Sequence, residues 1–186
     1  DSAEALVRAG GFDLLMIGSP NHLHLDHIRL GLEAGVKVFS EKPIVSSIAQ
    51  TYELAALLGK HGSENLLVGL VLRYAPLYHD LLAARDSGAL GKIVSIEAAE
   101  HIFPYHGAFF MRDWRRYEKY SGSFMLEKCC HDLDLYNGLI GARPERVASF
   151  GGRKIFVPEN DPQLDGINDL SLFHRKPSGW NGTDKV

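Results

Sequence analysis

The sequence predicts an α/β fold: a Rossmann-type doubly wound parallel sheet followed by an α+β domain with a largely antiparallel open sheet. Three observations predict this class. Short apolar runs alternate with segments of helical periodicity in residues 1–90, as in parallel sheets connected by helices. The periodicity changes to two at residues 92–102, as in a sheet with one wet face. The chain has 186 residues, 45% of them hydrophobic, which is enough for a sizeable core.

The first strand and helix are predicted after a short helix over residues 1–8, with Asp1 as its N-cap. Residues 13–17 are a continuous apolar run, which is typical of a strand buried on both faces. Residues 24–34 carry apolar side chains at helical spacing and predict the helix that follows. Residues 36–39 predict the next strand.

Two further repeats complete the predicted Rossmann part, which we place at residues 1–90. Ser47 and Gln50 have the spacing of a capping box, which predicts the start of a helix. Residues 65–70 predict a third strand. Pro76 stands at the predicted first turn of the next helix, where proline is favoured.

The second predicted domain covers residues 91–186. Its first element is a strand over residues 92–102, where side chains alternate between two faces. Residues 124–140 predict a helix, and residues 147–156 predict another strand. The polar, turn-rich end of the chain carries no predicted element.

Charge and composition exclude several classes of partner. The formal net charge of −3 provides no broad basic surface for nucleic acid or an acidic membrane. The longest nearly apolar run, residues 66–72, is far shorter than the roughly 20 residues needed to cross a bilayer. The two adjacent cysteines, Cys129 and Cys130, provide no disulfide framework.

The side chains of these two cysteines and of His131 point about 100° apart on a helix, so we expect no metal site. A cytoplasmic protein with a small soluble partner is expected.

Polar side chains follow each predicted strand at its carboxyl end. The clusters are Ser19-Pro20-Asn21-His22, Glu41-Lys42-Pro43 and Arg73-Tyr74. In an open parallel sheet ligands bind beyond the carboxyl ends of the strands. We therefore expect these clusters to converge on one crevice, although an isolated Glu-Lys-Pro could equally be a solvated pair and a turn.

One face of the predicted helix over residues 124–140 carries ionisable groups. Glu127, His131 and Asp134 stand at positions i, i+4 and i+7, which lie on the same side of a helix. Taken alone, His131 could be a core histidine with satisfied hydrogen bonds, and Glu127 a surface charge. In combination with Lys42 they indicate a catalytic site.

The order of these motifs resembles the glucose-fructose oxidoreductase, inositol dehydrogenase and MocA (Gfo/Idh/MocA) family. The motifs are S-P-N-H-x-H, E-K-P, L-R-Y, W-R and L-E-x-x-x-H-x-x-D, and they cover the chain to about Gly152. The resemblance implies that Lys42 and His131 face the substrate beside the nicotinamide of NAD or NADP. Glu127 occupies the position where the family usually has aspartate, and we expect it to contact substrate or a catalytic group. The residues expected to bind cofactor are Ser19, Pro20, Asn21, His24, Glu41, Lys42, Arg73, Trp114 and Arg115. Trp114 could equally be a core anchor and Arg115 a surface charge.

The expected reaction is hydride transfer between NAD or NADP and a secondary alcohol of a sugar, cyclitol or related polyol. We expect His131 to accept the hydroxyl proton, Lys42 to polarise the substrate oxygen, and Asp134 to orient the imidazole. The alternatives are a non-catalytic regulator of the same fold that binds nucleotide or sugar, and an NAD-dependent glycosidase. The glycine-rich turn G-x-G-x-x-G does not occur in the sequence, so we expect an internal portion of a family member. Relatives suggest a homo-oligomer, a dimer or tetramer.

Overall fold

Three parallel strands form the sheet in the first half of the chain. The structure is a computed structural model that describes residues 2–111, 113–154 and 157. In spatial order the strands are β1 (Leu14–Ile17), β2 (Lys37–Glu41) and β3 (Leu66–Gly69). Leu15 of β1 is in register with Val38 of β2, and both pairings are parallel. The carboxyl ends of all three strands therefore meet at one edge, which confirms the predicted parallel sheet.

The predicted helices of this half are present. They are α1 (Ala3–Ala9), α2 (His24–Glu33) and α3 (Ile48–His61), with 3-10 turns at η1 (Asn21–Leu23), η2 (Ser63–Asn65) and η3 (Val71–Tyr74). Ser47 caps α3 by accepting a hydrogen bond from the backbone N–H of Gln50, as the capping pattern predicts. Helix α1 is capped by Ser2, whose hydroxyl accepts from the N–H of Ala5. The expected cap, Asp1, lies outside the described residues.

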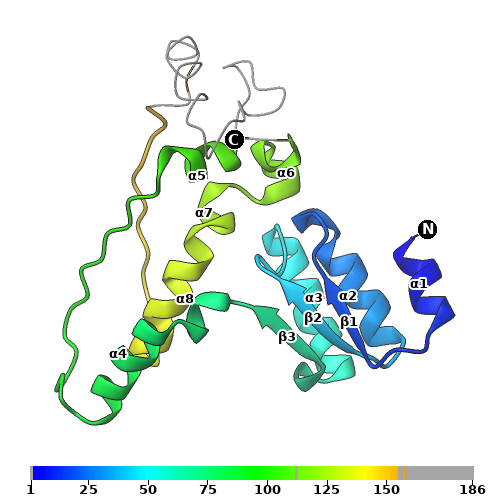
Figure 1. Cartoon of the computed structure of the whole chain (residues 1–186), viewed down its shortest axis with the longest axis horizontal. Helices are drawn as coiled ribbons and strands as arrows, with labels where there is room; N and C mark the ends of the chain where they lie inside the picture. The colour runs from blue at the N-terminus through cyan, green and yellow to red at the C-terminus, as the bar shows by residue number, and fades with distance from the viewer. Residues whose placement is uncertain (1, 112, 155–156, 158–186) are drawn as a thin grey trace.

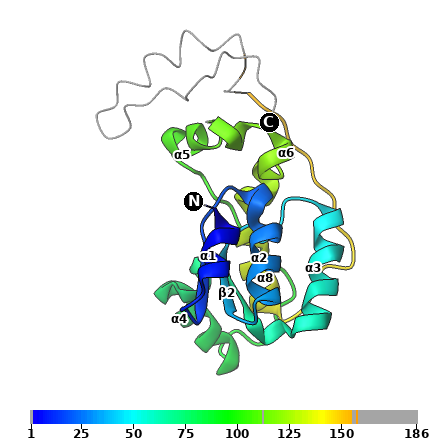
Figure 2. The same cartoon turned by 90° about the vertical axis from the view of Figure 1, so that its right-hand side faces the viewer.

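One face of the sheet is packed and the other is open. Helix α2 lies on β1 and β2, with α1 and α3 beside it (Figures 1 and 2). The core between them consists of Leu15, Ile17, Leu25, Ile28, Leu32, Val38, Val45, Leu54 and Leu57. Gly31 lets α2 approach the sheet, because a Cβ there would lie 2.6 Å from Cγ2 of Val38. On the other face Leu14 and Met16 are 49% and 68% exposed. The prediction that β1 is buried on both faces is therefore wrong, since helices cover only one side of it among the described residues.

All regular secondary structure described in the second half of the chain is helical. Its elements are α4 (Pro76–Asp86), α5 (Pro104–Phe109), η4 (Asp113–Arg116), α6 (Glu118–Ser121), α7 (Phe124–Glu127) and α8 (Cys129–Ile140). The single helix predicted over residues 124–140 is divided into α7 and α8 at Lys128. The side chain of Lys128 is buried there, and its ammonium pairs with the carboxylates of Glu100 and Asp132. Of the residues on the predicted face, Glu127 therefore lies in α7, and His131 and Asp134 lie in α8.

The two strands predicted in the second half are not formed. Residues 92–102 and the described part of residues 147–156 have no strand assignment, and nearly all of them are exposed. Figure 1 shows both as long extended segments outside the sheet. A β-strand needs a neighbouring strand for its backbone N–H and C=O groups. Neither segment pairs with a strand in the part of the chain that the structure describes.

Helix α8 is held against the first half by hydrogen bonds from α4. The hydroxyl of Tyr78 donates to the carbonyl oxygen of Leu135 at 3.1 Å. Nη1 of Arg85 donates to the carbonyl oxygens of Gly138 and Leu139 at 2.8 and 3.1 Å. These contacts hold the C-terminal half of α8 against α4, which follows β3 and η3 in the chain. None of the helices described is both long and apolar enough to cross a membrane.

Candidate active site

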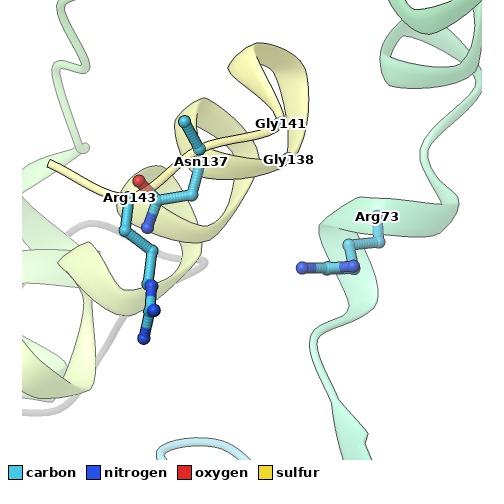
Figure 3. Close-up of a pocket in the computed structure, with 6 residues that line it drawn as sticks. Arg73, Asn137, Gly138, Gly141 and Arg143 are labelled. Atoms are coloured by element: carbon cyan, nitrogen blue, oxygen red, sulfur yellow. The ribbon is translucent and has the colours of Figure 1, made fainter.

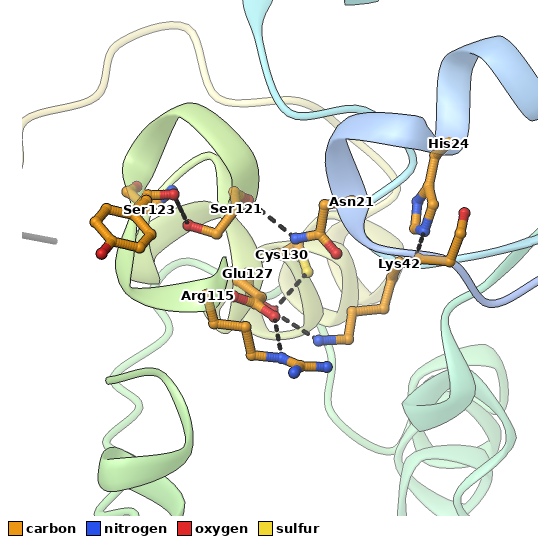
Figure 4. Close-up of polar contacts among 10 residues, drawn as sticks. Asn21, His24, Lys42, Arg115, Ser121, Ser123, Glu127 and Cys130 are labelled. Carbon is orange, nitrogen blue, oxygen red and sulfur yellow. Dashed lines mark hydrogen bonds and ion pairs between the residues drawn. The ribbon is translucent and has the colours of Figure 1, made fainter. Parts of the chain in front are cut away.

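Lys42 at the end of β2 reaches across to the second half of the chain. Its Nζ donates a hydrogen bond to the backbone carbonyl oxygen of Glu127 at 2.8 Å, 85 residues away in sequence (Figure 4). The peptide bond between Lys42 and Pro43 is cis, and the backbone N–H of Lys42 donates to the carboxylate of Glu41. The structure therefore brings the Glu-Lys-Pro motif to the helical face that sequence patterns singled out.

Glu127 is a buried carboxylate in this contact region. The residue is only 4% exposed, and its Oε1 accepts a hydrogen bond from Nε of Arg115 at 3.1 Å. Burial raises the pKa of Glu127, and the positive charges of Arg115 and Lys42 offset part of this effect. Its carboxylate holds Arg115 while its main-chain oxygen holds Lys42, so one residue organises two cations.

His131 lies one helical turn after Glu127. The pKa of its imidazole is lowered, first by burial and then by the positive charges of Lys42 and Lys128. Its Nδ1 is buried and has no hydrogen-bond partner among the described residues. A neutral imidazole in such surroundings is able to accept a proton.

Asp134 does not orient His131, contrary to the expectation from sequence. It instead forms a bidentate ion pair with Arg73, with Nε to Oδ2 and Nη2 to Oδ1 both at 2.6 Å. Arg73 also lines a cavity of about 290 Å³ at the C-terminal end of α8 (Figure 3). The complete lining is Arg73, Asn137, Gly138, Gly141, Ala142 and Arg143. Arg73 thus connects η3 to α8, and Asp134 neutralises its charge.

The residues after β1 connect the two halves. Nδ2 of Asn21 donates to the carbonyl oxygen of Ser121 at 3.0 Å. His24 is 1% exposed, and its two ring nitrogens lie 2.8 Å from the carbonyl oxygens of Pro43 and Ser19. His24 is therefore enclosed between two loops, and the contact with the cofactor that the resemblance implies for it stays a prediction.

Aromatic side chains surround Arg115. Its guanidinium carbon lies 4.1 Å from the ring centroid of Phe109 and 4.4 Å from that of Trp114. The ring of Trp114 also faces His22, with centroids 6.4 Å apart, and His22 packs on Tyr120 at 4.6 Å. Sequence reasoning missed Tyr120 and Phe109, because the aromatic segment around them has no clear period.

Cys130 is a further neighbour that sequence reasoning did not assign to the site. Its Sγ lies 3.6 Å from the carbonyl oxygen of Glu127, the same atom that binds Lys42. Burial raises the pKa of this thiol. The helical spacing between Glu127 and Cys130 could have indicated that they are neighbours. Lys42, Glu127, His131 and Arg115 are thus brought together, while Arg73 lies apart with Asp134.

Two side-chain oxygen atoms without hydrogen-bond donors among the described residues fit the nicotinamide-ribose end of a dinucleotide. Oδ1 of Asn21 and one carboxylate oxygen of Glu41 accept no hydrogen bond from the described residues. Such acceptors suit ribose hydroxyls and a carboxamide N–H. They lie after β1 and at the end of β2, where ligands of parallel sheets bind. No cluster of three or more metal-ligating side chains was found within the described residues.

Comparison with known proteins identifies both halves. Residues 1–70 match the family description "Oxidoreductase family, NAD-binding Rossmann fold", and residues 86–167 match "Oxidoreductase family, C-terminal alpha/beta domain". Both descriptions belong to the Gfo/Idh/MocA family. The predicted fold class is confirmed by these matches, while the boundary near residue 90 stays a prediction.

Individual relatives have inositol and sugar-related names. The scyllo-inositol 2-dehydrogenase (NAD(+)) of Bacillus subtilis is 28% identical over 86% of this chain and 43% of its own length. The 2,7-anhydro-N-acetylneuraminate hydratase of Mediterraneibacter gnavus is 27% identical over 75% of this chain and 36% of its own. The crystal structure of scyllo-inositol dehydrogenase from Lactobacillus casei with NAD(H) and scyllo-inositol has a TM-score of 0.61. It is 26% identical, over 76% of this chain and 41% of that one.

The chain thus spans about two fifths of the length of the relatives that it matches. Together the two family matches cover residues 1–70 and 86–167, most of the sequence. The chain belongs to the Gfo/Idh/MocA oxidoreductase family.

Proposed function

We propose that the protein is an NAD(P)-dependent oxidoreductase that moves a hydride between a nicotinamide and a secondary alcohol of a sugar, cyclitol or related polyol. One observation carries this proposal. The Lys42 ammonium is anchored to the main chain of Glu127, one helical turn before an imidazole with a lowered pKa and an unpartnered buried nitrogen. An alcohol oxidation needs this combination of an electrophilic hydrogen-bond donor and a neutral base.

In this mechanism the bound dinucleotide supplies the hydride acceptor or donor. His131 takes the hydroxyl proton of the alcohol during oxidation, because its lowered pKa keeps the imidazole neutral and so able to accept a proton. Lys42 donates a hydrogen bond to the same oxygen and stabilises its alkoxide character. The hydrogen bond from Lys42 to Glu127 directs the ammonium toward α8, and Glu127 in turn fixes Arg115.

The expected cofactor contacts remain part of this proposal. Asn21 and Glu41 would hold the nicotinamide-ribose end through their open oxygen atoms, and Ser19 and Pro20 would form the wall beside it. Arg73, in η3, stays an expected cofactor contact. Trp114 and Arg115 lie in the second half, so we assign Arg115 to the substrate side. A cofactor-bound relative carries NAD(H), which supports NAD, and the choice between NAD and NADP is left to binding experiments.

The substrate class rests on relatives. Two of them carry scyllo-inositol in their names, which supports a cyclitol or sugar for this chain. A reaction without net oxidation is the second candidate, because a relative of similar identity is named a hydratase. The NAD-dependent glycosidase expected as an alternative belongs to this group. The cytoplasm and a homo-oligomer remain predictions from sequence.

The proposal is tested by replacing His131 with alanine in the full-length protein. Turnover of a polyol panel, followed by NADH absorbance, should fall about 100-fold or more, because general-base catalysis contributes at least that much. His79→Ala is the matched control, since His79 is exposed on α4, and should not change turnover.

Three outcomes would count against the proposal. Retention of turnover within about threefold in His131→Ala would refute the base assignment, given the expected contribution. Product formation without net NADH would favour the second candidate. Nucleotide binding without any turnover would favour the non-catalytic regulator.

A further inference from the structure

Arg115 has more hydrogen-bonding capacity than the described residues use. Its Nε donates to Glu127 at 3.1 Å, but Nη1 and Nη2 have no partner in the part of the chain that the structure describes. An arginine carries five N–H donors in a fixed plane. Four of these donors, on the two terminal nitrogens, are therefore available to a ligand.

The guanidinium of Arg115 is held in place without those donors. The ring centroids of Phe109 and Trp114 lie 4.1 and 4.4 Å from its central carbon. The ion pair with Glu127 fixes a third side, and 28% of the arginine side chain remains exposed. A guanidinium fixed by rings and by a buried carboxylate loses little conformational freedom when a ligand binds.

A second cation lies next to this group. In Figure 4 the Lys42 ammonium and the Arg115 guanidinium both lie beside Glu127. Glu127 supplies one carboxylate for the two cations, and burial raises its pKa. The carboxylate of Glu41 accepts from the backbone N–H of Lys42, not from its ammonium. Glu127 and Glu41 are thus the carboxylates of this region, and neither accepts a hydrogen bond from the terminal nitrogens of Arg115.

We infer that the substrate carries a carboxylate close to the carbon that is oxidised, and that the two terminal nitrogens of Arg115 bind this carboxylate. The chemical class is a sugar acid, such as a uronate. Two parallel N–H···O bonds fit the planar fork of arginine to a carboxylate, whereas a neutral hydroxyl would leave some donors unpaired. This inference rests on the proposed function, because it takes the crevice beside Lys42 as the substrate site.

The test compares matched pairs of ligands on the full-length protein. D-glucuronate against D-glucose, and D-galacturonate against D-galactose, differ in a carboxylate at one end of the same ring. Affinities are measured by calorimetry with NADH present, which prevents oxidation of the alcohol. At least one uronate should bind roughly 10- to 100-fold tighter than its neutral partner, the range expected for charge-assisted hydrogen bonds.

Substitutions then locate the interaction. Arg115→Lys retains the charge but loses the fork, so the affinity ratio of uronate to neutral sugar should fall most of the way to one. Arg143→Lys is the matched control, since Arg143 lines the separate cavity at the end of α8, and should leave the ratio unchanged.

Several results would overturn the inference. One is an affinity ratio of uronate to neutral sugar near one for both pairs in the unmodified protein, or no binding at all. Another is an affinity ratio that Arg115→Lys leaves unchanged. The third is an affinity ratio that falls to one in Arg143→Lys. The proposed function is tested separately, by measuring NADH formation when the same ligands are supplied with NAD in place of NADH. A uronate preference without NADH formation would refute the dehydrogenase and support the binding site. NADH formed from neutral polyols alone would support the dehydrogenase and refute the carboxylate-binding site.

Discussion

The first half of the chain, up to β3, is organised around an apolar core, whereas the second half around α7 and α8 buries charged and polar groups among a few apolar ones. Nine buried hydrophobic residues form one cluster under α2 and α3. In the second half the buried residues include Phe110 and Met111, but also Ser121, Glu127 and Lys128. The first half is therefore held mainly by apolar packing, whereas the second half depends more on specific polar contacts.

The largest effect on stability is expected in the core of the first half. Ile28 is fully buried, so Ile28→Ala should lower the free energy of unfolding by about 2–5 kcal/mol through lost burial and a cavity. Urea denaturation followed by circular dichroism measures this. Ile48→Ala is the control, because Ile48 is 77% exposed and should change stability by no more than about 0.5 kcal/mol. Equal losses of unfolding free energy in the two variants would contradict the assignment of an apolar core to the first half.

A smaller effect is expected where the loops after β1 and β2 meet. His24→Phe retains the ring volume but removes the polar atoms that contact the carbonyl oxygens of Pro43 and Ser19. Buried carbonyl groups without partners should cost about 1–3 kcal/mol. The exposed His79→Phe serves as control in the same urea titration. A neutral result for His24→Phe would show that the two carbonyl groups find other partners.

The smallest effect is expected in the second half, from the pair between Glu100 and Lys128. The hydrogen bond from Lys128 lowers the pKa of Glu100. A carboxylate with a lowered pKa in the folded state stabilises the protein above its unfolded pKa, and this contribution is lost as the pH falls through the folded value. Glu100→Gln should therefore cost less than about 1 kcal/mol at pH near 7, because the side chain is 47% exposed and partly screened.

The pH dependence of that substitution provides its own check. The difference in unfolding free energy between the unmodified protein and Glu100→Gln should disappear in acid, where Glu100 is protonated in both states. Glu97→Gln, at an exposed position on the same segment, should show no difference at either pH. A difference that grows in acid would contradict the assigned direction of the pKa.

The first half was predictable because its signals are local. Apolar runs, the Ser47 cap and Pro76 each determine structure within a few residues, and all are present where expected. The strands of the second half were not formed, because pairing depends on a neighbouring strand and not on the alternating pattern of residues 92–102. The burial of only one face of β1 likewise depends on what covers the sheet.

The site was predictable where one helical face and one strand end carry it. Lys42, Glu127 and His131 come together because spacing along α7 and α8 survives the break at Lys128. The spacing could not predict that Asp134 pairs with Arg73, or that His24 contacts carbonyl oxygens on both sides, since these partners are distant in sequence. Arg115 was predicted from its motif, but its contacts with the rings of Phe109 and Trp114 depend on three-dimensional packing.

Two of the links between the two halves end on main-chain oxygen atoms. Asn21 binds the carbonyl of Ser121 and Lys42 binds the carbonyl of Glu127, and a carbonyl group is present whichever side chain occupies the position. Side-chain substitutions at positions 121 and 127 therefore leave the acceptor atoms of these two hydrogen bonds in the chain, so the Lys42 ammonium can keep its main-chain partner whichever residue stands at position 127.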